Sequence, residues 1–370
     1  MPDLMTNILT AVAVAGAITF VLALLLVIAD ATIANYGEVM ITINDDKKVF
    51  VEGGRSLLST LKEEEIFISS ACGGRGSCGL CKVRVLDGAG DVLPTELPWL
   101  TPEERAGQVR LSCQCKVKRD MRVAIPEALL SVRQFQTEVV GLRDLTYDIK
   151  EVTLKLLEPE AIEFTAGQFV QFEVPAYELT REPVYRAYSI ASDPSDNGRI
   201  QLNIRLVPNG ICTTYVHKHL KEGERITING PHGDFYLRDT DREIVFIAGG
   251  SGMAPIRSIL FDMAAKGSKR TAAYYFGAKA KRDLFLVEEM KEFEKRLASF
   301  SFVPALSSPD PEDNWDGQTG LITDVVERNV RNGANSEAYL CGSPGMINAA
   351  IKSLTKCGVP EDRIYYDKFA

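Results

Sequence analysis

The sequence lacks an excess of positive charge, is poor in histidine, and contains no internal repeat or low-complexity tract. Its 370 residues include 42 lysines and arginines against 50 aspartates and glutamates, a formal charge of −8. Nucleic-acid binding needs a basic face, so this balance gives that function no support. The three histidines, His217, His219 and His232, are interpreted as structural or surface residues. The length and the 45% of hydrophobic residues predict two or three folded domains.

Basic residues are absent before Lys47, and charge of either sign is absent from Ile8 to Ala29. A helix over this run would span about 33 Å, enough for the roughly 30 Å hydrocarbon core of a bilayer. A signal peptide is the alternative, and the A-x-A match at residues 29–31 favours it. The length of the run and the missing basic residues argue against it. We therefore expect residues 1–35 to hold a tail and a membrane-spanning helix, at about 7–30, that anchors the chain in a lipid bilayer.

Three further domains are predicted from changes in pattern along the chain. Residues 36–130 combine a hairpin, a short helix and a cysteine-rich loop, which indicates a small α+β domain. Residues 131–240 contain short strands separated by Gly, Pro or Asp, which predicts an antiparallel β-barrel. Residues 241–370 alternate apolar strands with helices, which predicts an α/β domain with a doubly wound parallel sheet.

The eight cysteines are too few and too unevenly placed for a disulfide scaffold. Cys72, Cys78 and Cys81 share the glycine-rich loop "ACGGRGSCGLC", and Cys113 lies far beyond them. Zinc ribbons pair two C-x-x-C units, whereas this spacing is typical of plant-type [2Fe–2S] ferredoxins except for one extra residue in the first gap. Cys115 is a second candidate for the fourth ligand. We expect Cys113 and Cys115 to alternate along a strand, so that only one of them faces the cluster.

Two motifs in the strand-rich region together indicate a flavin site. In "RAYS", Arg186 can clamp a diphosphate, Tyr188 can stack on a flat ring, and Ser189 can hydrogen-bond a ring nitrogen. In "GICTTYVHK", residues 210–214 begin a helix whose free N–H groups favour a phosphate. Either motif alone is usually an ordinary strand or helix start.

Two more motifs indicate a nucleotide site in the last domain. "IAGGSGMAPIRS", residues 247–258, reads as a strand, a glycine turn and a helix with Pro255 in its first turn. Such a turn can hold a pyrophosphate although it is not G-x-G-x-x-G. "YLCGSPGM" places Cys341 where a strand ends, which is where open α/β sheets bind ligands; a buried apolar cysteine is the alternative.

In this order the motifs resemble the ferredoxin–NADP⁺ reductase superfamily over residues 134–370 and a fused β-grasp [2Fe–2S] ferredoxin over residues 36–128. The C-x5-C gap, "DVLPTEL", "RLSCQ", "PEDNWDGQTG" and the anchor extend the resemblance to the family of F subunits of sodium-translocating NADH:quinone reductases. The segments before "RAYS" and "GICTT" are shorter here than in that family. The alternatives are a three-domain reductase that feeds an oxygenase or hydroxylase and a non-catalytic zinc-binding membrane protein.

The resemblance implies electron transfer from NADH through FAD to a [2Fe–2S] cluster and on to membrane subunits of a sodium-pumping quinone-reductase complex. It places the soluble domains on the cytoplasmic face of the inner membrane. The implied catalytic residues are Cys341, Ser189 and Tyr188. The implied FAD contacts are Arg186, Tyr188, Ser189, Asn203, Ile204, Arg205, Gly210, Cys212, Thr213, Thr214 and Phe369. The implied NADH contacts are Gly249, Gly250, Ser251, Gly252, Met253, Ala254, Pro255, Cys341, Gly342 and Pro344, and the implied cluster ligands are Cys72, Cys78, Cys81 and Cys113.

The choice between NADH and NADPH turns on a basic segment after "YYFGA". Lys279, Lys281 and Arg282 could meet a 2′-phosphate, or they could form a solvated turn. Because this turn resembles that of the NADH-using family, NADH is the expected donor.

Overall fold

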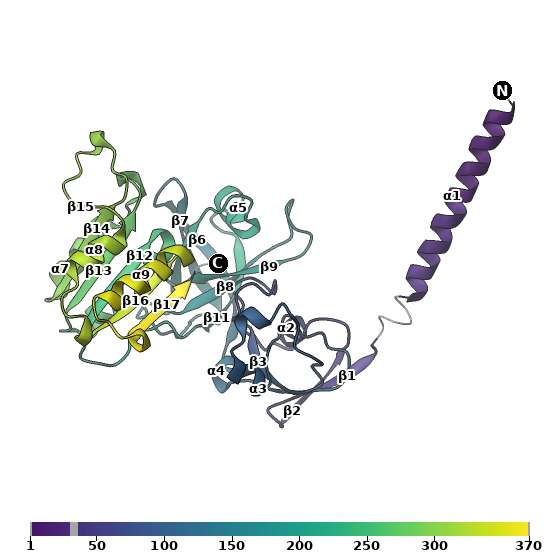
Figure 1. Cartoon of the computed structure of the whole chain (residues 1–370), viewed down its shortest axis with the longest axis horizontal. Coiled ribbons are helices and arrows are strands. Elements are labelled where there is room, and N and C mark those ends of the chain that lie inside the picture. Colours follow the sequence, from purple (N-terminus) through teal and green to yellow (C-terminus); the bar gives the residue numbers. More distant parts are fainter. Residues whose placement is uncertain (1, 30–35, 369–370) are drawn as a thin grey trace. The chain divides into compact units, whose positions relative to one another are not determined.

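A computed structural model of the protein describes residues 2–29 and 36–368, with the elements labelled in Figure 1. Its contacts divide the chain into two compact units, Met1–Ile68 with Cys81–Glu127 and Ser69–Leu80 with Ala128–Ala370. The middle of the cysteine loop therefore belongs to the second unit. The domain boundaries at residues 35, 130 and 240 stay predictions.

The first element, α1 (Pro2–Ala29), is one continuous helix (Figure 1). Its segment Thr6–Val27 is long and apolar enough to cross a membrane, and none of that segment is buried in the protein. It is the one helix in the described parts of the chain that meets this criterion. Asp30 and Ala31 of the A-x-A match lie outside the described residues.

The first unit carries a five-stranded mixed sheet in the order β2-β1-β5-β3-β4. Alternate side chains of β1, at Val39, Ile41 and Ile43, point into the core, as the period of a strand requires. Ser56 caps the N-terminus of helix α2, and its hydroxyl accepts from the Ser59 amide. The elements are β1 (Glu38–Ile43), β2 (Lys47–Glu52), α2 (Leu57–Glu63), β3 (Lys82–Asp87), α3 (Pro102–Ala106), β4 (Val109–Leu111) and β5 (Met121–Ala124).

The second unit contains a six-stranded antiparallel sheet in the order β10-β7-β6-β11-β8-β9. The two edge strands meet at a bridge between Ile190 and Leu202, which makes the sheet a partly closed barrel around an apolar core. Its elements are α4 (Glu127–Leu130), β6 (Arg133–Asp144), β7 (Ile149–Glu158), β8 (Phe169–Val174), β9 (Val184–Ser189), β10 (Arg199–Arg205), α5 (Ile211–Lys218) and β11 (Arg225–His232).

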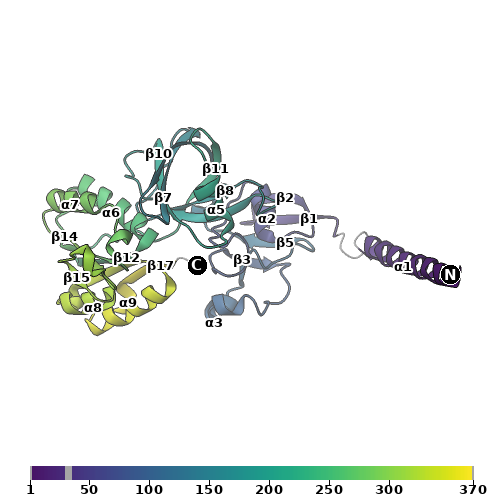
Figure 2. The ribbon, with the colours of Figure 1, turned by 90° about the horizontal axis from the view of Figure 1, so that it is seen from above.

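The same unit contains a parallel sheet in the order β15-β14-β13-β12-β16-β17, covered on both faces. Figure 2 shows α6 and α7 on one face and α8 and α9 on the other. Burial on both faces explains why the central strand β12 reads as a continuous apolar run. The elements are β12 (Glu243–Gly249), η3 (Gly250–Gly252), α6 (Met253–Ala265), β13 (Ala272–Ala278), α7 (Val287–Arg296), β14 (Phe300–Leu306), β15 (Gln318–Thr319), α8 (Ile322–Asn329), β16 (Ser336–Gly342), α9 (Pro344–Lys356) and β17 (Ile364–Lys368).

Arg257 joins the two sheets of the second unit. It extends from α6, its side chain is almost fully buried, and it donates to Glu289 on α7. The same guanidinium donates to Glu151 on β7 and to Gln201 on β10. A buried charge is stable only when paired, so this network fixes the nucleotide sheet against the barrel.

Candidate functional site

The four cysteines predicted to bind iron form two thiol pairs. The Sγ atoms of Cys72 and Cys78 lie 3.4 Å apart in the loop of the second unit, and the hydrogen bond between them lowers the pKa of Cys72 to about 4. In the first unit, a hydrogen bond with Cys113 raises the pKa of Cys81. In a [2Fe–2S] centre four protein ligands are shared between two irons, so two pairs of thiolates suit its donor set. Within residues 2–29 and 36–368, no three or more His, Cys, Asp or Glu side chains gather as a site for a single metal ion.

The prediction of a strand through Cys113 and Cys115 is wrong. Strand β4 ends at Leu111, and the chain then turns, because the amides of Gln114 and Cys115 both donate to the Leu111 carbonyl. Cys115 is 1% exposed, and burial raises the pKa of its thiol to about 12, so it stays a neutral core side chain. Cys113 is partly exposed and pairs with Cys81. Pattern reasoning missed the turn because both flanking segments read as strand.

The residues predicted to hold FAD come from three neighbouring elements of the barrel. Arg186, Tyr188 and Ser189 end β9, and residues 203–205 end β10. Gly210 is the N-cap of α5 and residues 211–214 form its first turn, which has no side-chain cap, so its N–H groups are available to a phosphate. The Thr213 hydroxyl accepts from the Val207 amide and so closes the turn before the helix. Phe369 lies outside the described residues.

Asn203 shows that this site fits a planar heterocycle with donors and acceptors. Its side chain is 4% exposed, yet neither its Oδ1 nor its Nδ2 has a hydrogen-bond partner in the described chain. Buried amides are nearly always hydrogen-bonded, because leaving one unpaired costs about 1–3 kcal/mol. A flavin ring carries both kinds of partner, so the chemistry of Asn203 suits FAD.

Replacing Asn203 with leucine should have opposite effects on the apoprotein and on FAD binding. Without flavin, Asn203→Leu removes two unpaired polar atoms at nearly constant volume, so the apoprotein should unfold at an equal or higher denaturant concentration. With flavin, the lost hydrogen bonds should weaken FAD affinity by roughly 10- to 100-fold. Fluorescence titration of FAD and urea unfolding of the apoprotein measure the two effects. Equal FAD affinity in variant and wild type would contradict this role.

The glycine turn predicted to hold NADH packs directly against the strand that carries Cys341. A Cβ on Gly252 would lie 2.2 Å from the Cys341 carbonyl oxygen, so only glycine fits there. Gly250 has φ +55, and a Cβ there would lie 3.4 Å from Arg205 at the end of β10. Helix α6 then starts at Met253 with no side-chain cap. The turn therefore touches both the nucleotide strand β16 and the flavin strand β10.

A cavity of about 290 Å³ lies at the carboxyl ends of β12 and β13. Of the predicted site residues, Arg205 and Gly250 line it, and so does Lys279, which the sequence offered as a contact for a 2′-phosphate. Sequence reasoning missed the other lining residues, which are Tyr147, Asp148, Ile149, Gly277, Ala278, Asp283, Ser307, Leu321, Ile322 and Met346. Asp148 pairs with Arg205 at 2.8 Å, a contact between residues so far apart in sequence that no local signal announces it. The sequence did predict that a ligand would bind beyond the carboxyl ends of the parallel strands, where such sheets bind ligands.

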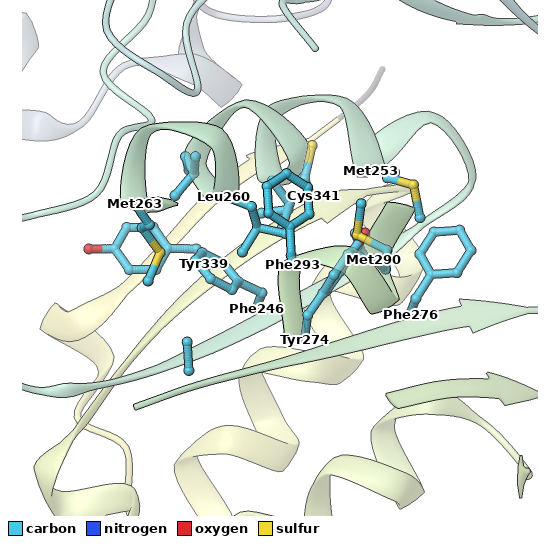
Figure 3. Close-up of a cluster of buried hydrophobic side chains, with 14 of the residues drawn as sticks. Phe246, Met253, Leu260, Met263, Tyr274, Phe276, Met290, Phe293, Tyr339 and Cys341 are labelled. Atoms are coloured by element: carbon cyan, nitrogen blue, oxygen red, sulfur yellow. The ribbon is translucent and has the colours of Figure 1, made fainter. Parts of the chain in front are cut away.

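Cys341 is fully buried in the same core cluster as Met253 and Tyr339 (Figure 3). Burial raises the pKa of its thiol well above the ordinary value, so the group stays neutral. A neutral thiol is a weak nucleophile, and Cys341 can serve a nearby ring through packing rather than through covalent chemistry.

Comparison with known proteins matches all three regions to cofactor-binding families. Residues 41–118 match the 2Fe-2S iron-sulfur cluster binding domain, and residues 136–236 match the oxidoreductase FAD-binding domain. Residues 246–352 match the oxidoreductase NAD-binding domain. Together with the fold, these matches define an iron–sulfur flavoprotein oxidoreductase that uses a nicotinamide nucleotide.

Whole-chain relatives identify the family. The chain is 38% identical to the Neisseria meningitidis Na(+)-translocating NADH-quinone reductase F subunit, over 95% of this chain and 96% of the relative. It is also 38% identical to the Klebsiella pneumoniae protein of the same name, over 95% and 97%. The protein belongs to the family of Na(+)-translocating NADH-quinone reductase F subunits.

Solved structures share the three-domain fold. A cytochrome P450 reductase from Amycolatopsis superposes with a TM-score of 0.72 at 29% identity, over 90% of this chain and 98% of that one. The ferredoxin reductase of a carbazole 1,9a-dioxygenase superposes with a TM-score of 0.69 at 26% identity, over 90% and 99%. The predicted order of ferredoxin, flavin and nucleotide domains along the chain is thereby confirmed.

Proposed function

We propose that this chain oxidises NADH and passes the electrons, through FAD and a [2Fe–2S] cluster, to the membrane subunits of a quinone-reductase complex. The observation that carries the proposal is one polypeptide that unites an apolar N-terminal helix with three cofactor domains and belongs to the family of F subunits. Bound FAD accepts the two electrons of a hydride, and the cluster accepts them one at a time. The protein binds, orients and tunes these groups.

For FAD, the roles follow from what each side chain offers. Arg186 and the first N–H groups of α5 supply positive charge for the diphosphate. Tyr188 lies edge-on to Phe172 with ring centroids 6.1 Å apart, which holds its ring for stacking against the flavin. The buried Ser189 hydroxyl and the Asn203 amide supply hydrogen bonds to the ring edge. Burial raises the pKa of Tyr188, so its hydroxyl stays protonated.

For the cluster, we assign Cys72 and Cys78 to one iron and Cys81 and Cys113 to the other. The thiol pairing described above supports this division. The glycines of the loop support it too, since Gly73, Gly74, Gly76 and Gly79 all have positive φ. Such a backbone lets amide groups turn toward the sulfurs, which a loop of L-residues with side chains rarely does. The zinc alternative instead needs four donors around one ion.

NADH, rather than NADPH, is the donor that the lining of the cavity favours. Of the three basic residues after "YYFGA", Lys281 donates to the Asp313 carbonyl and Arg282 stacks on Tyr147. Arg205, a further cation in the lining of the cavity, is paired with Asp148. Lys279 lines the cavity, but the Asp283 carboxylate lines it as well and would repel a 2′-phosphate.

We therefore expect kcat/KM for NADH to exceed that for NADPH by at least roughly tenfold, as a like-charge contact of about 1.4 kcal/mol predicts. Asp283→Asn should narrow the ratio of kcat/KM for NADH to kcat/KM for NADPH, because it raises kcat/KM for NADPH. Asp313→Asn, which lies outside the cavity, should leave this ratio unchanged. Steady-state kinetics with both nucleotides measure these ratios. Equal preference in the wild type would contradict the assignment of NADH.

The membrane orientation follows from the donor. Because NADH is an intracellular reductant, we place the cofactor domains on the cytoplasmic face of the inner membrane, with α1 crossing the bilayer. A protease added to right-side-out vesicles should leave the cofactor domains intact, and disrupting the vesicles should expose them. Digestion of the domains in sealed right-side-out vesicles would contradict this orientation.

A reductase that feeds an oxygenase is the second candidate, because the solved structures named above are of that kind. The x5 cysteine gap, α1 and the whole-chain identity to the F subunits argue for the quinone-reductase complex. Affinity purification of the chain from detergent-solubilised membranes should recover integral-membrane quinone-reductase subunits. Recovery of an oxygenase component instead would overturn this choice of partner.

A further inference from the structure

His232, interpreted from the sequence as a structural or surface histidine, has a defined partner in the cysteine loop. It ends β11, is 1% exposed, and stacks on Phe169 with ring centroids 5.4 Å apart. Its Nε2 lies 2.7 Å from Asn229 Oδ1, and its Nδ1 lies 3.1 Å from Ser69 Oγ. An amide oxygen can only accept, so Nε2 carries the proton and Nδ1 accepts from the Ser69 hydroxyl. Burial lowers the pKa of His232 to about 4, which keeps this neutral tautomer at neutral pH.

Ser69 is the first residue of the loop segment that belongs to the second compact unit. Four residues further on, Gly73 adopts φ +65 and lies against β9. A Cβ on Gly73 would be 2.4 Å from Arg186 Nη1 and 2.8 Å from the Tyr185 carbonyl oxygen. Any side chain there would have to displace the loop or the arginine. The loop is therefore fixed at two points, one at the end of β11 and one on β9, the strand that carries the flavin motif.

We propose that the Ser69–His232 hydrogen bond is a latch that positions the cysteine loop on β9 and thereby sets the rate of electron transfer from FAD to the cluster. Cys72 lies between the two contact points, next to Gly73, so the latch places one iron-binding pair beside Arg186. His232 acts through Ser69 and is a positioning residue. The inference rests on the proposed function, in which one NADH and two oxidised clusters give one NAD⁺, one proton and two reduced clusters.

The test uses the full-length holoprotein and two substitutions at Ser69. Ser69→Ala removes the donor, and Ser69→Thr keeps the hydroxyl. After rapid anaerobic mixing with NADH, flavin bleaching reports the hydride step, and freeze-quench EPR of the reduced cluster reports the next step. Loss of one neutral hydrogen bond predicts about a fivefold slower cluster reduction in Ser69→Ala, with flavin bleaching unchanged. Ser69→Thr should stay within about twofold of the wild type.

Hydrogen exchange provides a second readout that does not depend on turnover. In Ser69→Ala, the amides of residues 70–79 should exchange several-fold faster than in the wild type at equal iron and sulfide content. Gly73→Ala should also slow cluster reduction, since it pushes the loop away from β9. Gly90→Ala is the matched control, because Gly90 has φ +69 but nothing within 4 Å of a Cβ, so it adds similar backbone strain without a clash.

Wild-type rates and wild-type exchange in Ser69→Ala would overturn the latch. Equal slowing in Ser69→Ala and Ser69→Thr would overturn it as well, because the hydroxyl would then not matter. A failure of the proposed function is recognised separately and earlier: in that case NADH would fail to reduce flavin or cluster in the wild-type protein itself.

Discussion

The Cys113→Ala protein should lose the [2Fe–2S] EPR signal completely, while Cys115→Ala should retain it. Cys113 is partly exposed, follows the end of β4, and shares a hydrogen bond with Cys81. Cys115 is a buried core residue, and its pKa is raised by burial rather than by a hydrogen bond to another thiol, so it does not complete a thiol pair as Cys113 does with Cys81. NADH should still bleach the flavin in both variants, because neither residue lies in the flavin or nucleotide motifs.

The comparison is controlled, since the two cysteines are close together in the same turn and both are replaced by alanine. Cys115→Ala should cost only the packing of a small buried side chain, roughly 1 kcal/mol of unfolding free energy. Iron and sulfide analysis, with EPR after dithionite reduction, measures the outcome. Retention of the cluster in Cys113→Ala together with its loss in Cys115→Ala would reverse the assignment.

Replacing Glu96 with glutamine should destabilise the ferredoxin fold by about 3–5 kcal/mol, the typical cost of leaving a buried charge unpaired. The Glu96 side chain is fully buried and accepts from Arg110, from the Leu93 amide and from the Leu111 amide. Burial alone would raise the pKa of Glu96, but these hydrogen bonds outweigh it and hold the pKa below its ordinary value. Glu96 is therefore ionised throughout the neutral range, and Glu96→Gln leaves the Arg110 guanidinium uncompensated.

Asp45→Asn provides the matched control for Glu96→Gln in the same domain. Asp45 pairs with Arg122, but both side chains are more than half exposed, so breaking this pair should cost about 0–1 kcal/mol. Urea unfolding of the full-length protein, followed by the visible absorbance of the cluster, compares the two variants. Equal midpoints for Glu96→Gln and Asp45→Asn would show that burial of the pair is not what stabilises the domain.

Local patterns predicted the elements well where one physical cause dominated. Three features each lie within one continuous stretch of sequence: the uncharged run of α1, the apolar strand β12 and the glycine turn after it. The boundaries of these elements in the structure lie close to those stretches. The turn at Cys113 was missed, because two flanking strand patterns conceal a backbone that bonds back to Leu111.

Contacts between distant residues could not be predicted from local patterns. Asp148 pairs with Arg205, which lies 57 positions further along the chain, in the cavity. Ser69 pairs with His232, which lies 163 positions further along. The unpaired amide of Asn203 likewise becomes visible only when its surroundings are in place. The resemblance to a known family predicted the roles of the motifs, whereas the contacts between side chains that connect the motifs are seen only in the structure.

The most direct test of the account is an optical and EPR spectrum of the purified full-length protein before and after anaerobic addition of NADH. We expect an oxidised spectrum with both flavin and iron–sulfur absorbance, bleaching of the flavin by NADH, and the appearance of the EPR signal of a reduced [2Fe–2S] cluster. A colourless metal-bearing protein would contradict it, as would a flavin that NADH reduces while the cluster stays oxidised.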